Sequence, residues 1–148
     1  MANIDERLAL LEDEDRILQT LYIYGHSLDY DLEEDFMNCW TPDAVLDWPD
    51  RPPIRGHAAL RLAFRAHTHA PAAWHKHMVF EPLIRIEAGR ATVQSMFARL
   101  DRYPAAPAVR SFGRYRDTLL RGDDGCWRFV ERIAEREGTR SREPVAAA

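Results

Sequence analysis

The chain has 148 residues, a formal net charge of −4 and 46% apolar residues, which suffices for one domain with a sizeable core. Acidic and basic residues are interspersed, so neither a nucleic-acid footprint nor a basic membrane-binding helix is indicated. No apolar run reaches the roughly 20 residues of a membrane span, no secretory pattern opens the chain, and Cys39 and Cys126 lack metal or redox spacing. We therefore expect a cytoplasmic protein.

Helices are predicted for the first part of the chain. Residues 1–15 place charged side chains around leucines and indicate a helix or a helical lead-in. From Asp13 onward, apolar residues recur at helical spacing on one face, namely at Ile17, Leu21, Tyr24 and Leu28. Asp13 or Asp15 would cap the start of this helix, and residues 29–31 would end it. A short helix is expected over 32–39.

The next segment combines chain breakers with one strand and one helix. The run Thr41-Pro42-Asp43 predicts a break, and residues 44–48 predict a short strand. Three prolines between 49 and 53 predict a loop. Gly56 precedes a third helix, which would end before Pro71 and whose inward face would carry Leu60, Ala63, Phe64 and His67.

The rest of the chain predicts four strands, at 75–87, 90–101, 109–121 and 126–137. Ala88-Gly89 and the run from Gly122 to Gly125 have tight-turn chemistry, so two of the connections are expected to be hairpins. Residues 138–148 are predicted to form a flexible tail, which leaves 1–137 as a single domain.

Helices followed by an antiparallel meander predict an α+β fold. We expect a curved, mixed but mainly antiparallel sheet that wraps around the N-terminal helices and forms a cone. The interior of such a cone is a largely apolar pocket, which is a usual site for a small-molecule ligand.

Three widely spaced residues could perform proton transfer: Asp29, His77 and Arg132. A carboxylate can orient an imidazole, and a cation can stabilise the charge that develops on a substrate. His75 lies two residues before His77 and shares its strand face, so the pattern leaves open which histidine acts. A metal site is not expected, because the histidine pairs lack a carboxylate at a recognisable motif spacing.

Tyr24 and Arg132 each have a structural alternative. Tyr24 lies on the apolar stripe and would be about 140° around the helix from Asp29, so the two could flank a pocket without touching. It could also be a core residue with a satisfied hydroxyl. Arg132 could simply pair with Asp117 or Glu131.

Short motifs along residues 15–135 resemble the SnoaL-like branch of the nuclear-transport-factor-like α+β cone superfamily. The motifs are Tyr24-x4-Asp29, Trp40-Thr41-x-Asp43-Ala44, Ile54-x-Gly56, His77-x6-Ile84, Gly113-Arg114-Tyr115-x-Asp117 and Gly125-x-Trp127-Arg128-Phe129-x3-Arg132. The arrangement is most similar to the Asp–His dyad lyases: scytalone dehydratase, bile-acid dehydratase and hexachlorocyclohexane dehydrochlorinase. The same fold also hosts cyclases, isomerases, epoxide hydrolases and non-catalytic subunits.

The resemblance implies site residues. Asp29 and His77 match the dyad, and Arg132 matches a pocket arginine. Tyr24 matches a tyrosine of bile-acid dehydratase at a position where the dehydrochlorinase has a lysine. The pair Arg99-x-Asp101 is similar to part of the epoxide-hydrolase site, but that site needs a second carboxylate on the last strand. Asp101 could alternatively be an auxiliary acid.

These observations predict a lyase or isomerase that needs no metal or other cofactor and acts on a small, apolar, cyclic substrate with an activated C–H. His77 would be the general base, Asp29 would hold its tautomer, Tyr24 would hydrogen-bond the substrate, and Arg132 would stabilise negative charge. One alternative is a non-catalytic small-molecule binding module, which would apply if His77 faced solvent. Another is an epoxide hydrolase or a cyclase on the same fold, and epoxide hydrolysis would require two carboxylates around Arg99 in the pocket. The predicted pocket wall comprises Phe36, Trp40, Trp48, Phe64, Trp74, His75, Met78, Phe97, Asp101, Phe112 and Tyr115.

The predicted strands carry apolar residues on both faces, for example Met96 beside Phe97 and Leu119 beside Leu120. A sheet whose outer face is partly apolar usually buries that face against another subunit. The lyases that the chain resembles are often trimers, and other members of the superfamily are dimers. We therefore expect a homo-oligomer, either a trimer or a dimer.

Overall fold

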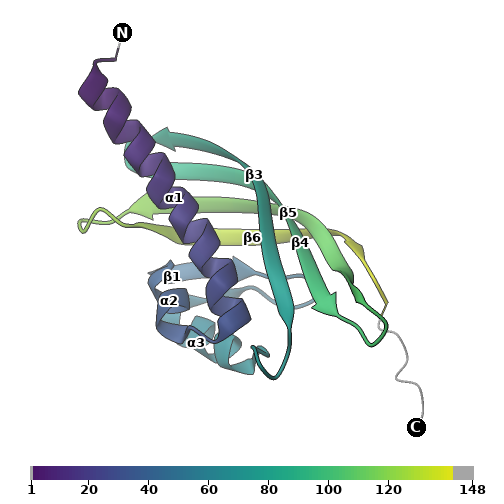
Figure 1. Cartoon of the computed structure of the whole chain (residues 1–148). Helices are drawn as coiled ribbons and strands as arrows, with labels where there is room; N and C mark the ends of the chain where they lie inside the picture. Colours follow the sequence, from purple (N-terminus) through teal and green to yellow (C-terminus); the bar gives the residue numbers. More distant parts are fainter. Residues whose placement is uncertain (1, 142–148) are drawn as a thin grey trace.

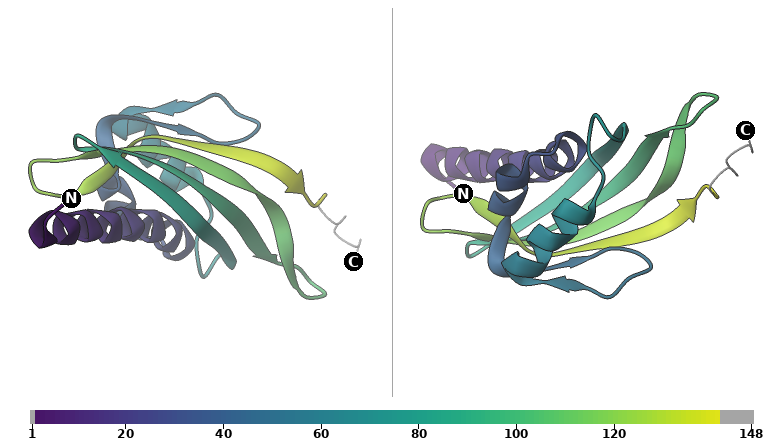
Figure 2. Two further views of the ribbon diagram at one scale, coloured as in Figure 1. Left: turned by 90° about the horizontal axis from the view of Figure 1, so that it is seen from above. Right: turned by 90° about the horizontal axis from the view of Figure 1, so that it is seen from below.

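A computed structural model describes residues 2–141 of the protein. These residues form three helices on one face of a curved six-stranded sheet (Figures 1 and 2). We call the face that packs on the helices the inner face and the opposite one the outer face. The elements are α1 (Ile4–Tyr30), α2 (Glu33–Asn38), β1 (Trp40–Asp47), β2 (Ile54–Arg55), α3 (Gly56–Ala66), β3 (His75–Glu87), β4 (Arg90–Arg102), β5 (Pro107–Arg121) and β6 (Trp127–Thr139).

Helix α1 is continuous from Ile4, so a helix start at Asp13 or Asp15 was wrong. Asn3 caps the helix: its side chain accepts a hydrogen bond from the Glu6 backbone N–H at 2.9 Å, and the Glu6 carboxylate accepts one from the Asn3 N–H at 2.9 Å. This capping box fixes the true N-terminus. The first turns project past the sheet (Figure 1) and leave their apolar side chains exposed, so the packing periodicity begins well inside the helix.

Strand β1 continues through Thr41-Pro42-Asp43, where a break was predicted. Trp40 pairs with Phe129 of β6, but the next residue of β1 that pairs with β6 is Val45, opposite Glu131, so the intervening residues bulge out of the ladder. A bulge tolerates the proline, which has no N–H to donate. The two-residue strand β2 pairs with β1 in a segment that was predicted to be a loop.

The sheet order is β2-β1-β6-β5-β4-β3. Strand β1 runs parallel to β6, and every other neighbouring pair is antiparallel. The predicted hairpins β3–β4 and β5–β6 are present, and Gly89 and Gly125 adopt positive φ values of 74° and 77° in their turns. The predicted α+β fold with a curved, mainly antiparallel sheet around N-terminal helices is therefore confirmed.

The core fills the space between α1 and the inner face of the sheet. The predicted stripe of α1 is buried, including Leu21 and Leu28. Phe36, Trp40 and Phe64 belong to this core, with exposures of 0–1%, and do not line the pocket described below. Their assignment to the pocket wall was wrong, because α2, β1 and α3 each contribute one of these rings, and the Phe36 ring packs against both of the others.

The described residues bear on the predicted C-terminal limit of the domain and on the expected lack of a membrane-spanning helix. Strand β6 runs to Thr139, past the predicted domain limit at 137. Residues 142–148, which make up most of the predicted tail, lie outside the described part. Within residues 2–141, no helix combines the length and the apolarity needed to cross a membrane.

Candidate active site

Asp29 anchors the site from the last turn of α1. Its side chain is buried and accepts three hydrogen bonds: from His75 Nδ1 (2.8 Å) and His77 Nδ1 (2.7 Å) at Oδ1, and from the His77 backbone N–H (3.0 Å) at Oδ2. Burial raises the pKa of Asp29, but the hydrogen bonds from His75 and His77 outweigh it and bring the pKa well below its usual range. Asp29 is therefore a carboxylate.

Gly25 allows β3 to approach the helix closely enough for these bonds. A Cβ at this position would lie 2.7 Å from the backbone carbonyl oxygen of His77. Gly25 therefore sets the distance between the Asp29 turn and the histidines of β3.

His77 presents a free ring nitrogen to the pocket. Its Nδ1 faces the Asp29 carboxylate, which can only accept, so Nδ1 carries the proton and Nε2 carries the lone pair. Burial lowers the pKa of His77, although Asp29 acts in the opposite direction. A neutral imidazole held in one tautomer, with Nε2 unprotonated, is suited to act as a general base.

His75 is buried beside His77 but uses both of its ring nitrogens. Nδ1 lies 2.8 Å from Asp29 Oδ1, and Nε2 lies 2.6 Å from the carbonyl oxygen of Thr68. Both ring nitrogens are therefore already engaged by protein oxygens, and neither is open to a ligand in the pocket. The geometry thus separates the two candidate histidines: His77 faces the pocket, and His75 orients Asp29.

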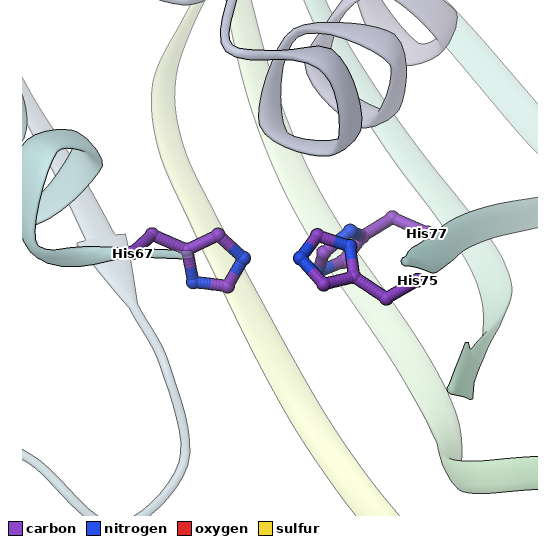
Figure 3. A group of neighbouring side chains, drawn as sticks. All are labelled: His67, His75 and His77. Atoms are coloured by element: carbon purple, nitrogen blue, oxygen red, sulfur yellow. The ribbon is translucent and has the colours of Figure 1, made fainter. Parts of the chain in front are cut away.

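His67, just after α3, completes a cluster of three imidazoles (Figure 3). Its ring centroid lies 5.1 Å from that of His75 and 5.6 Å from that of His77. Its Nε2 is buried and has no hydrogen-bond partner in the described part of the chain, and burial lowers the pKa of His67 to about 3. His67 is therefore a neutral ring inside the pocket wall.

The three histidines place ring nitrogens within 4.8 Å of one another, which raises the question of a metal site. His67 and His77 each offer an open nitrogen, but His75 could ligate a metal only by giving up Asp29 or Thr68. The donor set therefore fits a proton-transfer site better than a metal centre.

The pocket lies between α1, the β1–β2 loop and the inner face of β3–β6, with a volume of about 280 Å³. Of the residues predicted to be in it, His77, Tyr24, Trp48, Phe97 and Tyr115 are there. The complete lining is Tyr24, Trp48, Pro49, Arg51, His67, His77, Phe97, Arg99, Arg110, Ser111, Tyr115, Ala134, Arg136 and Thr139.

The remaining predicted wall residues lie elsewhere. Trp74, His75 and Asp101 border a separate hollow beside the loop at 102–107. Met78 and Phe112 are exposed on the outer face of the sheet, at 39% and 52%. These assignments were wrong because strand parity and β-bulges decide which residues face inward, and aromatic character alone does not.

Sequence reasoning missed the arginines of the lining. Arg99 is two residues from Phe97 on one strand, so it was bound to share the inner face. That signal was present in the sequence, although Arg99 was considered only as part of an epoxide-hydrolase site. The pocket lining contains no carboxylate within the described chain. An epoxide hydrolase therefore lacks the acidic residues that it would require here.

Tyr24 reaches the pocket from the buried face of α1. Its hydroxyl oxygen accepts a hydrogen bond from Trp48 Nε1 at 2.9 Å, which leaves the phenol proton available for a ligand. Burial raises the pKa of Tyr24 and of Tyr115, while the Arg132 charge lowers both. Both phenols therefore remain protonated donors.

Arg132 does not line the pocket. It is fully buried and makes a bidentate pair with Asp117, with distances of 2.8 and 2.9 Å, as one sequence alternative proposed. Its guanidinium carbon lies 4.3 Å from the ring centroid of Tyr24 and 3.8 Å from that of Tyr115. Direct contact with a ligand was therefore the wrong expectation, since the two phenol rings separate Arg132 from the pocket.

The comparisons with known proteins agree with this fold. The profile of the SnoaL-like domain family matches residues 9–133, which is most of the chain. No curated protein matches the sequence.

Solved structures with the same fold include the Mycobacterium tuberculosis protein Rv3472, whose function is unknown (26% identity, TM-score 0.79, 93% of this chain and 77% of that chain). An NTF2-like protein with a cystatin-like fold from Novosphingobium aromaticivorans matches at 23% identity and a TM-score of 0.78. This match covers 90% of this chain and 89% of that chain. A protein of the same organism, provisionally assigned as a scytalone dehydratase, matches at 19% identity and a TM-score of 0.74. This match covers 95% of this chain and 97% of that chain.

Proposed function

Because the chain belongs to the SnoaL-like domain family, we propose that it is a cofactor-independent enzyme of the dehydratase or isomerase type. The observation that carries the proposal is the His77–Asp29 contact of 2.7 Å beside an open pocket. The side chain of His77 is only 13% exposed and borders the pocket, which favours catalysis over a purely binding role.

In the proposed reaction, His77 Nε2 removes a proton from a carbon next to a carbonyl group. The bond electrons move toward the carbonyl oxygen, and the proton stays on Nε2. Asp29 stabilises the resulting imidazolium through Nδ1 and keeps the ring in the productive orientation. Such a positioned base contributes about 10²–10⁴-fold to the rate.

Tyr24 and Tyr115 would donate hydrogen bonds to the enolate oxygen. The Trp48 N–H already donates to the Tyr24 oxygen, and the charge of Arg132 lies against both phenol rings. Both interactions make the phenol protons stronger donors to a developing oxyanion. Arg132 would thus be a positioning residue that acts through the tyrosines.

The imidazolium can then return its proton in two ways. Transfer to a hydroxyl on the neighbouring carbon releases water and gives a dehydratase. Where a C=C bond of the substrate is conjugated with the enolate, transfer to the far carbon of this dienolate moves the double bond and gives an isomerase. The provisional scytalone dehydratase assignment of a structural neighbour makes dehydration the first of the two to test.

The test is deuterium incorporation from D2O into cyclic ketones, followed by NMR, because it reports C–H abstraction before any later step. We expect His77→Gln to reduce the enzyme-catalysed exchange at least about 100-fold and Asp29→Asn to reduce it strongly. His26→Gln is a matched control, since His26 is exposed on the same helix as Asp29. Exchange that persists in both site variants would contradict the proposal.

A further inference from the structure

The mouth of the pocket is lined by four arginines: Arg51 from the β1–β2 loop, Arg99 from β4, Arg110 from β5 and Arg136 from β6. We call this group the arginine mouth. Within the described chain, the lining contains no acidic residue. The whole protein has a net charge of −4, so this concentration of positive charge is a local feature of the pocket.

A β-bulge brings Arg110 into the group. Arg99 pairs with Ser111, whereas the next residue, Leu100, pairs with Val109. Arg110 is therefore the extra residue of β5, and its side chain joins that of Ser111 in the pocket lining. Bulges re-aim side chains in this way at binding sites.

Carboxylates of the protein neutralise the arginine mouth only in part. Asp101 pairs with both Arg99 (2.7 Å) and Arg110 (2.9 Å), and Asp50 pairs with Arg136 (2.6 Å). Arg51 lies over the Trp48 ring at 5.5 Å, with no ion pair to another residue in 2–141. Two carboxylates face four guanidinium groups, so positive charge remains for a bound anion.

The positive charge lies next to the candidate base. His77 and Arg99 are directly opposite each other in the β3–β4 ladder, and both side chains line the pocket. Directly opposite residues have Cβ atoms about 5 Å apart. A ring held between Trp48 and Phe97 would thus place an attached anionic group at the arginine mouth and a ring C–H near His77.

We propose that the pocket takes a small, ring-containing carboxylate, with the carboxylate held by the arginine mouth. A planar guanidinium matches a carboxylate in a bidentate fork. Among residues 2–141, the pocket lining includes no glycine and no helix N-terminus, the features that commonly cradle phosphate. The identification of this ligand as the substrate rests on the function proposed above; the binding preference itself does not.

The test is calorimetric titration with three unreactive probes of one shape: 2-naphthoate, the neutral 2-naphthalenemethanol and 2-naphthyl phosphate. At low salt, we expect 2-naphthoate to bind at least about tenfold more tightly than the alcohol, and the difference to shrink as salt is added. Arg51→Met and Arg99→Met should each reduce the preference for 2-naphthoate over the alcohol. Equal affinity for the acid and the alcohol would overturn the proposal, and tighter binding of the phosphate would overturn the choice of carboxylate.

Arg114→Met is the matched control. Arg114 lies on β5 like Arg110, but its side chain is exposed and paired with Glu135 and Glu137, so its removal should leave the preference unchanged. An equal loss in this variant would mean that only overall charge matters and would overturn the proposal.

The His77→Ala variant separates the two proposals. It should keep the preference for 2-naphthoate, because His77 is not needed to hold the anion. If the preference is missing while deuterium exchange still depends on His77, the carboxylate proposal fails and the proposed function stands. If the preference is present but exchange does not depend on His77, the carboxylate proposal holds as a binding property and the proposed function fails.

Discussion

Two arginine–aspartate pairs, Arg132–Asp117 and Arg99–Asp101, differ mainly in their contact with solvent. The side chains of Arg132 and Asp117 are 0% exposed, whereas those of Arg99 and Asp101 are 23% and 15% exposed. Loss of one member of a buried pair leaves an uncompensated charge in the interior, but a solvated pair can exchange partners at little cost. The same chemistry therefore fixes the core in one place and remains available to a ligand in the other.

The largest expected effect comes from removing Arg132. Arg132→Met leaves Asp117 buried without its partner and should lower the free energy of unfolding by about 3–5 kcal/mol, measured by urea denaturation. Arg99→Met should cost about 1 kcal/mol or less, since water and Arg110 still reach Asp101. The double variant Arg132→Met/Asp117→Leu should recover part of the loss. Similar costs for the two single variants would refute the distinction between the pairs.

Gly25→Ala tests the boundary between the core and the site. The added methyl group meets the carbonyl oxygen of His77, so β3 must shift away from Asp29. We expect a net loss of about 1–3 kcal/mol of unfolding free energy and a larger relative loss of deuterium exchange. His26→Ala, an exposed position on the same helix, controls for the higher helix propensity of alanine. Unchanged exchange in Gly25→Ala would show that the dyad tolerates the shift.

The half-buried, neutral His67 should make the stability of the folded protein sensitive to acid. Its pKa is lowered to about 3 in the folded state, against about 6.5 when unfolded, so the unfolded chain binds more protons between these values. Stability should therefore fall as the pH drops below about 6.5. Relative to His67→Phe, the wild type should lose about 3 kcal/mol more between pH 7.5 and 4.5, measured by denaturant unfolding at each pH. Parallel stability curves would contradict this assignment.

The smallest effect on the pocket is expected from changes to the outer face. Phe80 and Met96 are paired across β3 and β4, and both are exposed at 42% and 52%, close to the exposed Phe112. We propose that this apolar surface joins copies of the chain into a trimer or a dimer. Light scattering should give a multiple of 17.1 kDa, and Met96→Lys should lower the mass while ligand binding persists. A wild-type mass near 17.1 kDa would rule out this assembly.

The sequence predicted those features that depend on local patterns. The four long strands follow from alternating side chains and from turn residues such as Gly89 and Gly125. The Asp29–His77 pair followed from a motif resemblance. Residues 1–15 were predicted to be a helix or a helical lead-in, and the structure joins them to the packed stripe in one continuous helix. Only the cap at Asp13 or Asp15 was wrong, because Asn3 and Glu6 make the capping box.

The partner of Arg132 illustrates what local patterns cannot decide. The β5–β6 hairpin starts in a register that would bring Asp117 opposite Glu131. A register shift between Thr118 and Leu119 moves Asp117 opposite Arg132 instead. A one-residue shift reverses which face each side chain occupies, and nothing in the turn sequence reports it.

The double use of one oxygen atom has a consequence for the lifetime of the proposed intermediate. Asp29 Oδ1 already accepts a hydrogen bond from His75 Nδ1 as well as the one from His77 Nδ1. When His77 gains a proton, the imidazolium must therefore share its carboxylate oxygen with a second donor, so the captured proton is held only weakly. We expect this proton to exchange with solvent during the lifetime of the intermediate, which would appear as deuterium uptake from D2O into the substrate. Such a site is built to relay a proton within one catalytic cycle and not to store it.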